Sequence, residues 1–87
     1  MAINPDNNQQ TVTFTIKSEK DREIREALQG VYDSLKEKGY NPINQIVGYI
    51  LTEDPTYITN YNNARSVIRK IDRYELMRVL VQCFIKT

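Results

Sequence analysis

The sequence predicts an all-α protein: a compact bundle of four main helices plus a short helical turn, preceded by an extended or disordered N-terminal tail. Two observations support the helices: apolar residues recur with helical spacing after residue 18, and Gly, Asn, Pro and Asp separate the periodic segments. A third defines the tail, because the first ten residues are nearly all polar and have little apolar surface to bury. We therefore expect a tail at residues 1–17 and a helical domain at 18–87.

The tail contains one segment with a different pattern. Residues 11–16 (TVTFTI) alternate hydroxyl and apolar side chains, which is a strand signal. Because the rest of the chain is predicted to be helical, two arrangements stay open. The segment pairs with its twin across a dimer, or it is an extended tail that docks weakly.

The first helix is predicted to begin at Ser18 and to end at Gly39, a residue that readily takes positive φ. Charged pairs four residues apart, Asp21–Arg25 and Arg22–Glu26, are expected on its solvated face. Its buried stripe is expected to consist of Ile24, Ala27, Leu28, Val31, Tyr32 and Leu35.

The second helix is predicted to begin with Asn41 as N-cap and Pro42 at the first helical position. Gly48 lies inside this helix, where glycine costs about 1 kcal/mol relative to alanine. We therefore expect another helix to approach closely at that point. The buried stripe is expected to consist of Ile43, Ile46, Val47, Ile50 and Leu51.

Two further helices are predicted after a short turn around residues 56–58, which follows Asp54-Pro55. One runs from about residue 62 to residue 71. The other has Asp72 as N-cap and Glu75 three residues later, the spacing of a capping box. The buried stripe of this last helix is expected to consist of Leu76, Met77, Leu80, Cys83 and Phe84.

The composition excludes several kinds of chemistry. The chain has no histidine and one cysteine, so it has neither a His-based catalytic triad nor a four-thiolate zinc site. Its three glycines are too far apart to form a phosphate-binding loop. The acidic pairs Asp33/Glu37 and Glu53/Asp54 are expected on solvated surface, and Cys83 is expected to be a buried apolar residue. We predict no enzymatic activity, no catalytic residue, no cofactor and no metal.

An arginine patch is the strongest sign of a charged partner. Arg65, Arg69 and Arg73 gather near the junction of the last two helices. A small nucleic-acid-binding regulator would use such a patch, but the net charge is only +1 and acidic residues are interleaved. A solvated face, or a site for an anionic protein segment or a phosphate, is therefore favoured over nucleic acid.

Hydroxyl side chains in the tail are candidate phosphate acceptors. Thr11, Thr13, Thr15 and Ser18 lie in or next to a segment with little to bury, and kinases need an accessible, extended peptide. One phosphate would add about −1.5 to −2 charges, which exceeds the net charge of the whole chain. Ordinary β-propensity also explains these residues, so both interpretations stay open at this point.

A family resemblance narrows the choice. The string GYNPINQIVGY within residues 38–49 is long and unusual, and it is accompanied by residues 54–58, 63–65 and 68–70. Together these segments closely resemble the IreB family of small bacterial regulatory phosphoproteins, with similarity from about Thr11 to Phe84.

No apolar run approaches the roughly 18 residues needed to span a bilayer, so no membrane insertion is expected. The resemblance implies a cytoplasmic, non-enzymatic, helical homodimer. Its partners would be a transmembrane PASTA-type Ser/Thr kinase, the cognate phosphatase and an unknown downstream protein. The resemblance also implies that the protein acts in signalling from cell-wall stress, where it would restrain resistance to cell-wall antibiotics such as cephalosporins.

Within this resemblance, the family's Thr-Val-x-Phe pattern matches residues 11–14, which assigns the acceptor role to Thr11. Members with a second acceptor carry it three residues earlier, where this chain has Asn8. Thr13 is a second candidate acceptor, although no motif match supports it.

Two expectations follow for these surfaces. First, apolar residues or tyrosines that remain exposed are candidates for the dimer surface, and Tyr49, Tyr57 and Tyr61 are the ones expected. Second, a phosphate on Thr11 is expected to dock on the Arg65/Arg69/Arg73 patch and so to order the tail.

Overall fold

The computed structural model describes residues 19–85, and within that range it contains only helices and turns. The elements, in chain order, are α2 (Glu19–Glu37), α3 (Pro42–Thr52), the 3-10 turns η2 (Pro55–Tyr57) and η3 (Tyr61–Asn63), α4 (Ala64–Arg69) and α5 (Arg73–Ile85). The predicted class and the four main helices are therefore confirmed, whereas η3 was not expected. The predictions for the tail, the strand segment and the Ser18 cap lie outside the described residues.

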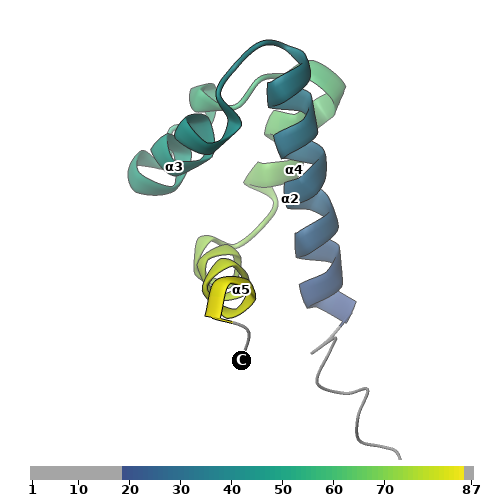
Figure 1. Cartoon of the computed structure of the whole chain (residues 1–87), viewed down its shortest axis with the longest axis vertical. Helices are drawn as coiled ribbons and strands as arrows, with labels where there is room; N and C mark the ends of the chain where they lie inside the picture. The colour runs from purple at the N-terminus through teal and green to yellow at the C-terminus, as the bar shows by residue number, and fades with distance from the viewer. Residues whose placement is uncertain (1–18, 86–87) are drawn as a thin grey trace, which may run out of the picture.

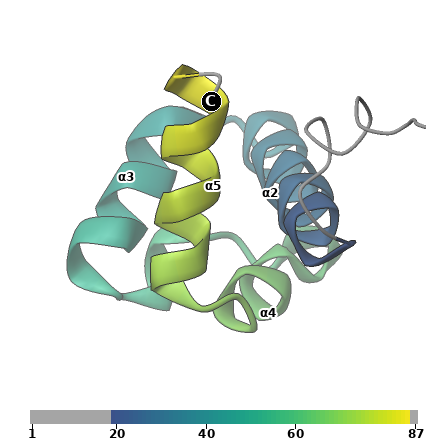
Figure 2. The same ribbon diagram turned by 90° about the horizontal axis from the view of Figure 1, so that it is seen from below.

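Helix α2 is the longest element, and the others pack along it. In Figure 1, α3 and α4 lie beside its second half, and α5 lies beside its first half. Figure 2 shows the molecule from below, where α5 lies between α3 and α2. This arrangement leaves α3 and α5 next to each other on one side of the molecule.

The helix ends agree with the capping signals in the sequence. Gly39 has φ +88°, and the amides of Gly39 and Tyr40 donate to the carbonyls of Lys36 and Leu35, both at 3.0 Å, which closes α2. Asn41 Oδ1 accepts a 3.0 Å bond from the Asn44 amide at the start of α3. The predicted caps at these two ends are confirmed.

Side-chain caps also define the turn η2 and the start of α5. Asp54 Oδ1 accepts from the Thr56 amide at 3.0 Å. Asp72 Oδ2 accepts from the Glu75 amide at 3.1 Å, as the capping signal predicts.

Helix α4 is shorter than predicted, and its start is a correction. The sequence pattern begins at residue 62, but Asn62 and Asn63 have φ values of 54° and 62°, so the helix begins only at Ala64. Asparagine tolerates this left-handed backbone better than other non-glycine residues do. The two asparagines therefore form a bend that joins η3 to α4.

Two buried clusters form the core. The larger one joins the second half of α2 to α3 and α4, and the smaller one joins Ile24 on α2 to Leu76 and Val79 on α5. Leu28 and Ile50 pack against both clusters and connect them. The larger cluster comprises Val31, Leu35, Ile46, Tyr49, Ile58, Ala64 and Ile68.

Gly48 meets a turn rather than another helix, which corrects the expected partner but confirms the close approach. A Cβ at Gly48 would lie 2.5 Å from Tyr57 Cε1. Glycine is therefore needed in α3 because the ring from η2 lies directly against its backbone.

Candidate functional site

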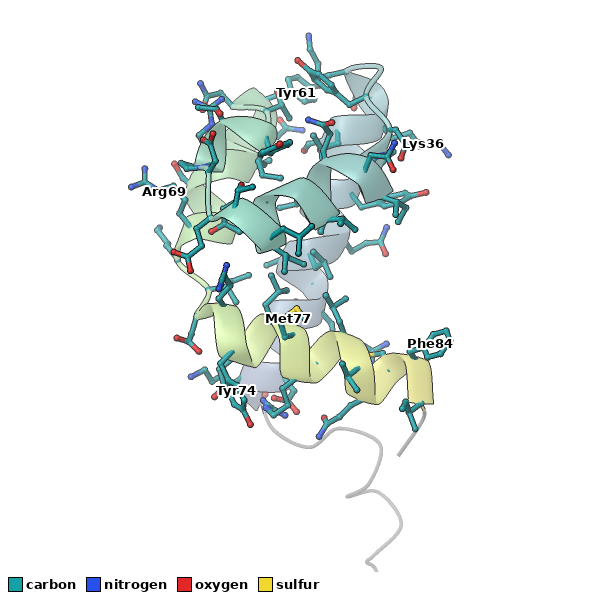
Figure 3. The ribbon with its side chains drawn as sticks, turned by 90° about the vertical axis from the view of Figure 1, so that its left-hand side faces the viewer. Lys36, Tyr61, Arg69, Tyr74, Met77 and Phe84 are labelled. Atoms are coloured by element: carbon teal, nitrogen blue, oxygen red, sulfur yellow. The ribbon has the colours of Figure 1, made fainter. Side chains whose placement is uncertain are left out.

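The three arginines predicted as one patch have different roles in the structure. Arg65 Nε donates a 2.8 Å hydrogen bond to the carbonyl of Ile58, which ties α4 to the end of η2. Arg69 is exposed in the last turn of α4 and extends outward in Figure 3. Arg73 begins α5. Arg69 and Arg73 line one common pocket, and Arg65 is not among its lining residues.

This pocket lies where α3, α4 and α5 meet and has a volume of about 310 Å³. Ile71 belongs to the link between α4 and α5, which lets it line the pocket between the two arginines. The remaining walls come from the end of α3 and from the first residue of η2. The full lining is Tyr49, Glu53, Pro55, Arg69, Ile71 and Arg73.

Glu53 supplies the acidic group of this pocket. It follows α3 with a left-handed backbone (φ 61°), and its amide donates to the Tyr49 carbonyl at 2.7 Å. Its carboxylate forms a 3.0 Å ion pair with Arg73. The same guanidinium donates to the Ile50 carbonyl, which places a cation at the C-terminal end of α3.

The neighbouring carboxylate, Asp54, serves the turn rather than the pocket. Its Oδ1 accepts a 2.7 Å bond from the Thr56 hydroxyl and a second bond from the Thr56 amide. These two bonds, with a smaller contribution from the positive charge of Arg65, hold the pKa of Asp54 below its ordinary value. Glu53 and Asp54 are adjacent in sequence but do not act as a pair.

The other acidic pair, Asp33 and Glu37, lies on exposed surface, as expected. Asp33 accepts a 3.0 Å bond from the Gln29 side chain. Glu37 accepts a 2.8 Å bond from the Tyr61 hydroxyl, and this bond raises the pKa of Tyr61. Within residues 19–85, no group of three Cys, Asp or Glu side chains is arranged to hold a metal ion.

Cys83 is exposed, so its predicted burial is wrong. The buried residues of α5 are Leu76 and Val79, with Leu80 half-buried beside them. The helix is thus rotated relative to the predicted stripe, and this places Met77 (42% exposed) and Phe84 (86% exposed) outside the core.

The predicted stripe of α3 is also only partly buried. Ile46 is in the core and Ile50 packs against it, whereas Ile43, Val47 and Leu51 are 60%, 47% and 76% exposed. These three residues follow one another at four-residue intervals and so lie along one side of α3. The apolar residues of α3 extend over a wider arc of the helix than a single core can cover. The width of this arc was the sequence signal that part of the predicted stripe would be exposed.

Exposed apolar residues of α3 and α5 together form what we call the α3/α5 face. In Figure 3, Met77 and Phe84 lie on the side of α5 that is turned toward α3. The face comprises Ile43, Val47 and Leu51 from α3 and Met77, Val81, Phe84 and Ile85 from α5.

Of the tyrosines expected at a dimer surface, only Tyr57 is exposed. Tyr49 is buried in the larger core cluster, which makes its expected exposure wrong. Tyr61 is half-buried, with Lys38 Nζ 5.2 Å from the centre of its ring. The phosphate acceptors Thr11 and Thr13 lie outside the described residues.

Comparison with known proteins identifies the family. Residues 9–86 match the sequence profile described as IreB regulatory phosphoprotein. The chain belongs to the IreB family. The resemblance inferred from residues 38–49 is therefore confirmed, and the protein is a regulatory phosphoprotein of this family.

Two relatives show how far this similarity extends. A UPF0297 protein of Acetivibrio thermocellus is 57% identical over 79 residues, covering 91% of this chain and 88% of the relative. A UPF0297 protein of Ruminiclostridium cellulolyticum is 52% identical over 77 residues, covering 88% of each chain. Both alignments span most of the two proteins, so the IreB family match concerns nearly the whole chain.

The length and polarity of the helices are relevant to the expected absence of membrane insertion. The longest, α2, carries charged residues throughout its length. Among the residues that the structure describes, no helix is both long and apolar enough to cross a membrane.

Proposed function

We propose that this IreB-family protein is a cytoplasmic, non-enzymatic substrate of a transmembrane PASTA-type Ser/Thr kinase and its cognate phosphatase. It acts in signalling of cell-wall stress and restrains cephalosporin resistance. Phosphorylation of Thr11 in the N-terminal tail switches it. The observation that supports this proposal is the family match, which begins at residue 9 and therefore includes Thr11.

Charge gives the switch its physical effect. The chain has a net charge of +1, and a phosphate on Thr11 adds about −1.5 to −2 charges, which reverses the sign of the net charge. The helical domain needs no rearrangement for this change. We expect a downstream protein to bind the phosphorylated and unphosphorylated forms differently, because their charges differ.

Phosphate mapping tests the acceptor. The full chain is incubated with a PASTA-type kinase domain and analysed by intact-mass and fragment mass spectrometry, with Thr11→Ala and Thr13→Ala variants in parallel. We expect a single phosphate that is lost only in Thr11→Ala and that the cognate phosphatase removes. Incorporation only at Thr13 or within the helices, or no incorporation, would contradict the proposal.

The expected homodimer is assigned to the α3/α5 face. A stable interface buries roughly 800 Å² on each partner, and this face offers seven large apolar side chains that are each 42–86% exposed. Large contiguous apolar patches are uncommon on monomeric soluble proteins. A second copy would cover them and add to the stability of a small domain.

Light scattering after size exclusion measures the oligomeric state. Leu51→Asp and Phe84→Asp each place a charge on the face, and we expect both variants to be folded monomers. Ser66→Asp is the control, because Ser66 is exposed on α4, which contributes no residue to the face. A monomeric native chain, or dimers in both face variants, would overturn the assignment.

A further inference from the structure

The pocket between α3, α4 and α5 has the composition of a small anion site. Two arginines on different elements, Arg69 and Arg73, line it, while Tyr49, Pro55 and Ile71 provide less polar walls. Guanidinium groups offer several N–H donors in a planar arrangement that suits phosphate oxygens. Arg69 makes no ion pair among the described residues, so its donors are available to a ligand.

The carboxylate of Glu53 already places a negative charge in this pocket. Its carboxylate lies 3.0 Å from Arg73, and its side chain is 62% exposed. Exposed ion pairs contribute little to stability, so the carboxylate can be displaced at little cost. A phosphate monoester carries more charge than a carboxylate and has three acceptor oxygens, which allows it to contact both arginines.

We propose that this pocket binds a phosphothreonine, and that its ligand is the phosphorylated Thr11 of the tail. Glu53 holds the site in the unphosphorylated protein and gives way to the phosphate. The inference rests on the proposed phosphorylation of Thr11. It also narrows the predicted arginine patch to Arg69 and Arg73, since Arg65 is engaged by the Ile58 carbonyl.

The length of the chain permits this contact within one molecule. The start of α2 is joined to α5 by the ion pair between Asp21 and Arg78 at 2.6 Å. Arg73 lies five residues before Arg78, about 7.5 Å along the helix axis. Thr11 precedes Glu19 by eight residues, which span at most about 29 Å when extended.

Arg73 connects the pocket to the rest of the molecule. Its guanidinium joins the first residue of α5 to the end of α3, through the Ile50 carbonyl and Glu53. A phosphate that replaces Glu53 changes the contacts at the point where the two helices of the α3/α5 face meet. Phosphorylation of the tail would thus act beside that face.

A peptide titration tests the pocket without any kinase. The ¹⁵N-labelled full chain is titrated with a synthetic peptide of residues 7–17 phosphorylated at Thr11, with the unphosphorylated peptide, and with inorganic phosphate. We expect amide shifts at Arg69, Ile71 and Arg73 with the phosphopeptide only. Its Kd should lie below about 1 mM, because a short tether supplies an effective concentration in that range.

Three variants make the test specific. Arg69→Gln should weaken binding at least about tenfold, as expected for loss of a charged hydrogen-bond donor. Glu53→Gln should tighten it roughly two- to fivefold, because the competing carboxylate is gone. Arg25→Gln, an exposed arginine on α2, should leave the Kd unchanged.

Each remaining outcome overturns the inference. Absence of shifts at millimolar phosphopeptide, equal shifts with the unphosphorylated peptide, or equal affinity for inorganic phosphate would exclude a phosphothreonine site. So would equal weakening by Arg25→Gln. Because the peptide is synthetic, phosphopeptide binding without phosphorylation of Thr11 by the kinase would reject the proposed function alone, and the reverse result would reject the pocket alone.

Discussion

The guanidinium of Arg78 on α5 donates two hydrogen bonds to the buried carboxylate of Asp21, at 2.6 and 3.3 Å. Its other donors reach Glu75 and Gln82, so all five N–H groups of Arg78 have an acceptor. The hydrogen bonds that Arg78 donates to Asp21 and Glu75 raise the pKa of Arg78, which keeps it charged. Asp21 is only 6% exposed, so this contact fixes the start of α2 against α5.

Loss of this contact should weaken the fold. Asp21→Asn removes the charge that Arg78 faces, and we expect the free energy of unfolding to fall by about 1.5–3 kcal/mol, the range for charged hydrogen bonds. Urea unfolding followed by circular dichroism measures it. Glu19→Gln is the control, because it breaks only the exposed pair with Arg22 and should leave the midpoint unchanged. Equal effects of the two variants would contradict the structural role of Asp21.

Gly48→Ala should destabilise the protein despite the better helix propensity of alanine. The new Cβ would lie 2.5 Å from the Tyr57 ring, and overpacking costs about 1–3 kcal/mol against a gain of about 1 kcal/mol from propensity. In a Tyr57→Ala background the clash is absent, and the same substitution should stabilise by about 1 kcal/mol. Thermal unfolding of the native chain, the two single variants and the double variant measures both effects. If Gly48→Ala changes stability in the same direction in both backgrounds, the close contact is refuted.

Asn63→Gly should stabilise the bend before α4 by about 0.5–1 kcal/mol, because glycine adopts its left-handed backbone without strain. The matched control is Asn60→Gly. Asn60 has an ordinary φ of −79°, so glycine there should stabilise nothing and should cost chain entropy. Chemical denaturation distinguishes the two sites. Equal responses would mean that the bend does not depend on positive φ.

Asp54 should make stability depend on acidic pH. Its folded pKa lies below the ordinary value of 3.8, so its contribution is complete above that pH and is lost as the pH falls through the folded pKa. Carbon-detected NMR titration of the carboxylate measures this value. Thr56→Val removes the hydroxyl bond and should move the pKa of Asp54 upward. A titration unaffected by this change would show that Thr56 does not hold the carboxylate.

Local chemistry made much of the fold predictable. The caps at Asn41 and Asp72 and the end of α2 at Gly39 depend on neighbouring residues, and such signals can be found in one sequence. The start of α4 was misplaced because the apolar spacing continues across Asn62 and Asn63, which allow a helical or a left-handed backbone.

The candidate site was less predictable, because it depends on contacts between distant segments. Arg65 and Arg73 have the same side chain and similar surroundings in sequence, yet one holds the Ile58 carbonyl and the other holds Glu53. Burial of Asp21 depends on Arg78, which lies 57 residues later. Periodicity shows that α3 and α5 are amphipathic, but it cannot determine which side of a broad apolar arc meets the core.

The small core cluster of α5 implies an uneven distribution of stability along the chain. Only Leu76 and Val79 of this helix are buried, and they meet Ile24 alone among the fully buried residues of α2. Elements with few buried contacts exchange their amide hydrogens through local opening at a lower free energy than the rest of a domain. We expect α5 to open as one cooperative unit while the segments around Leu35 and Ile68 stay protected. The protein would then sample a state in which α5 is released and α2, α3 and α4 remain packed.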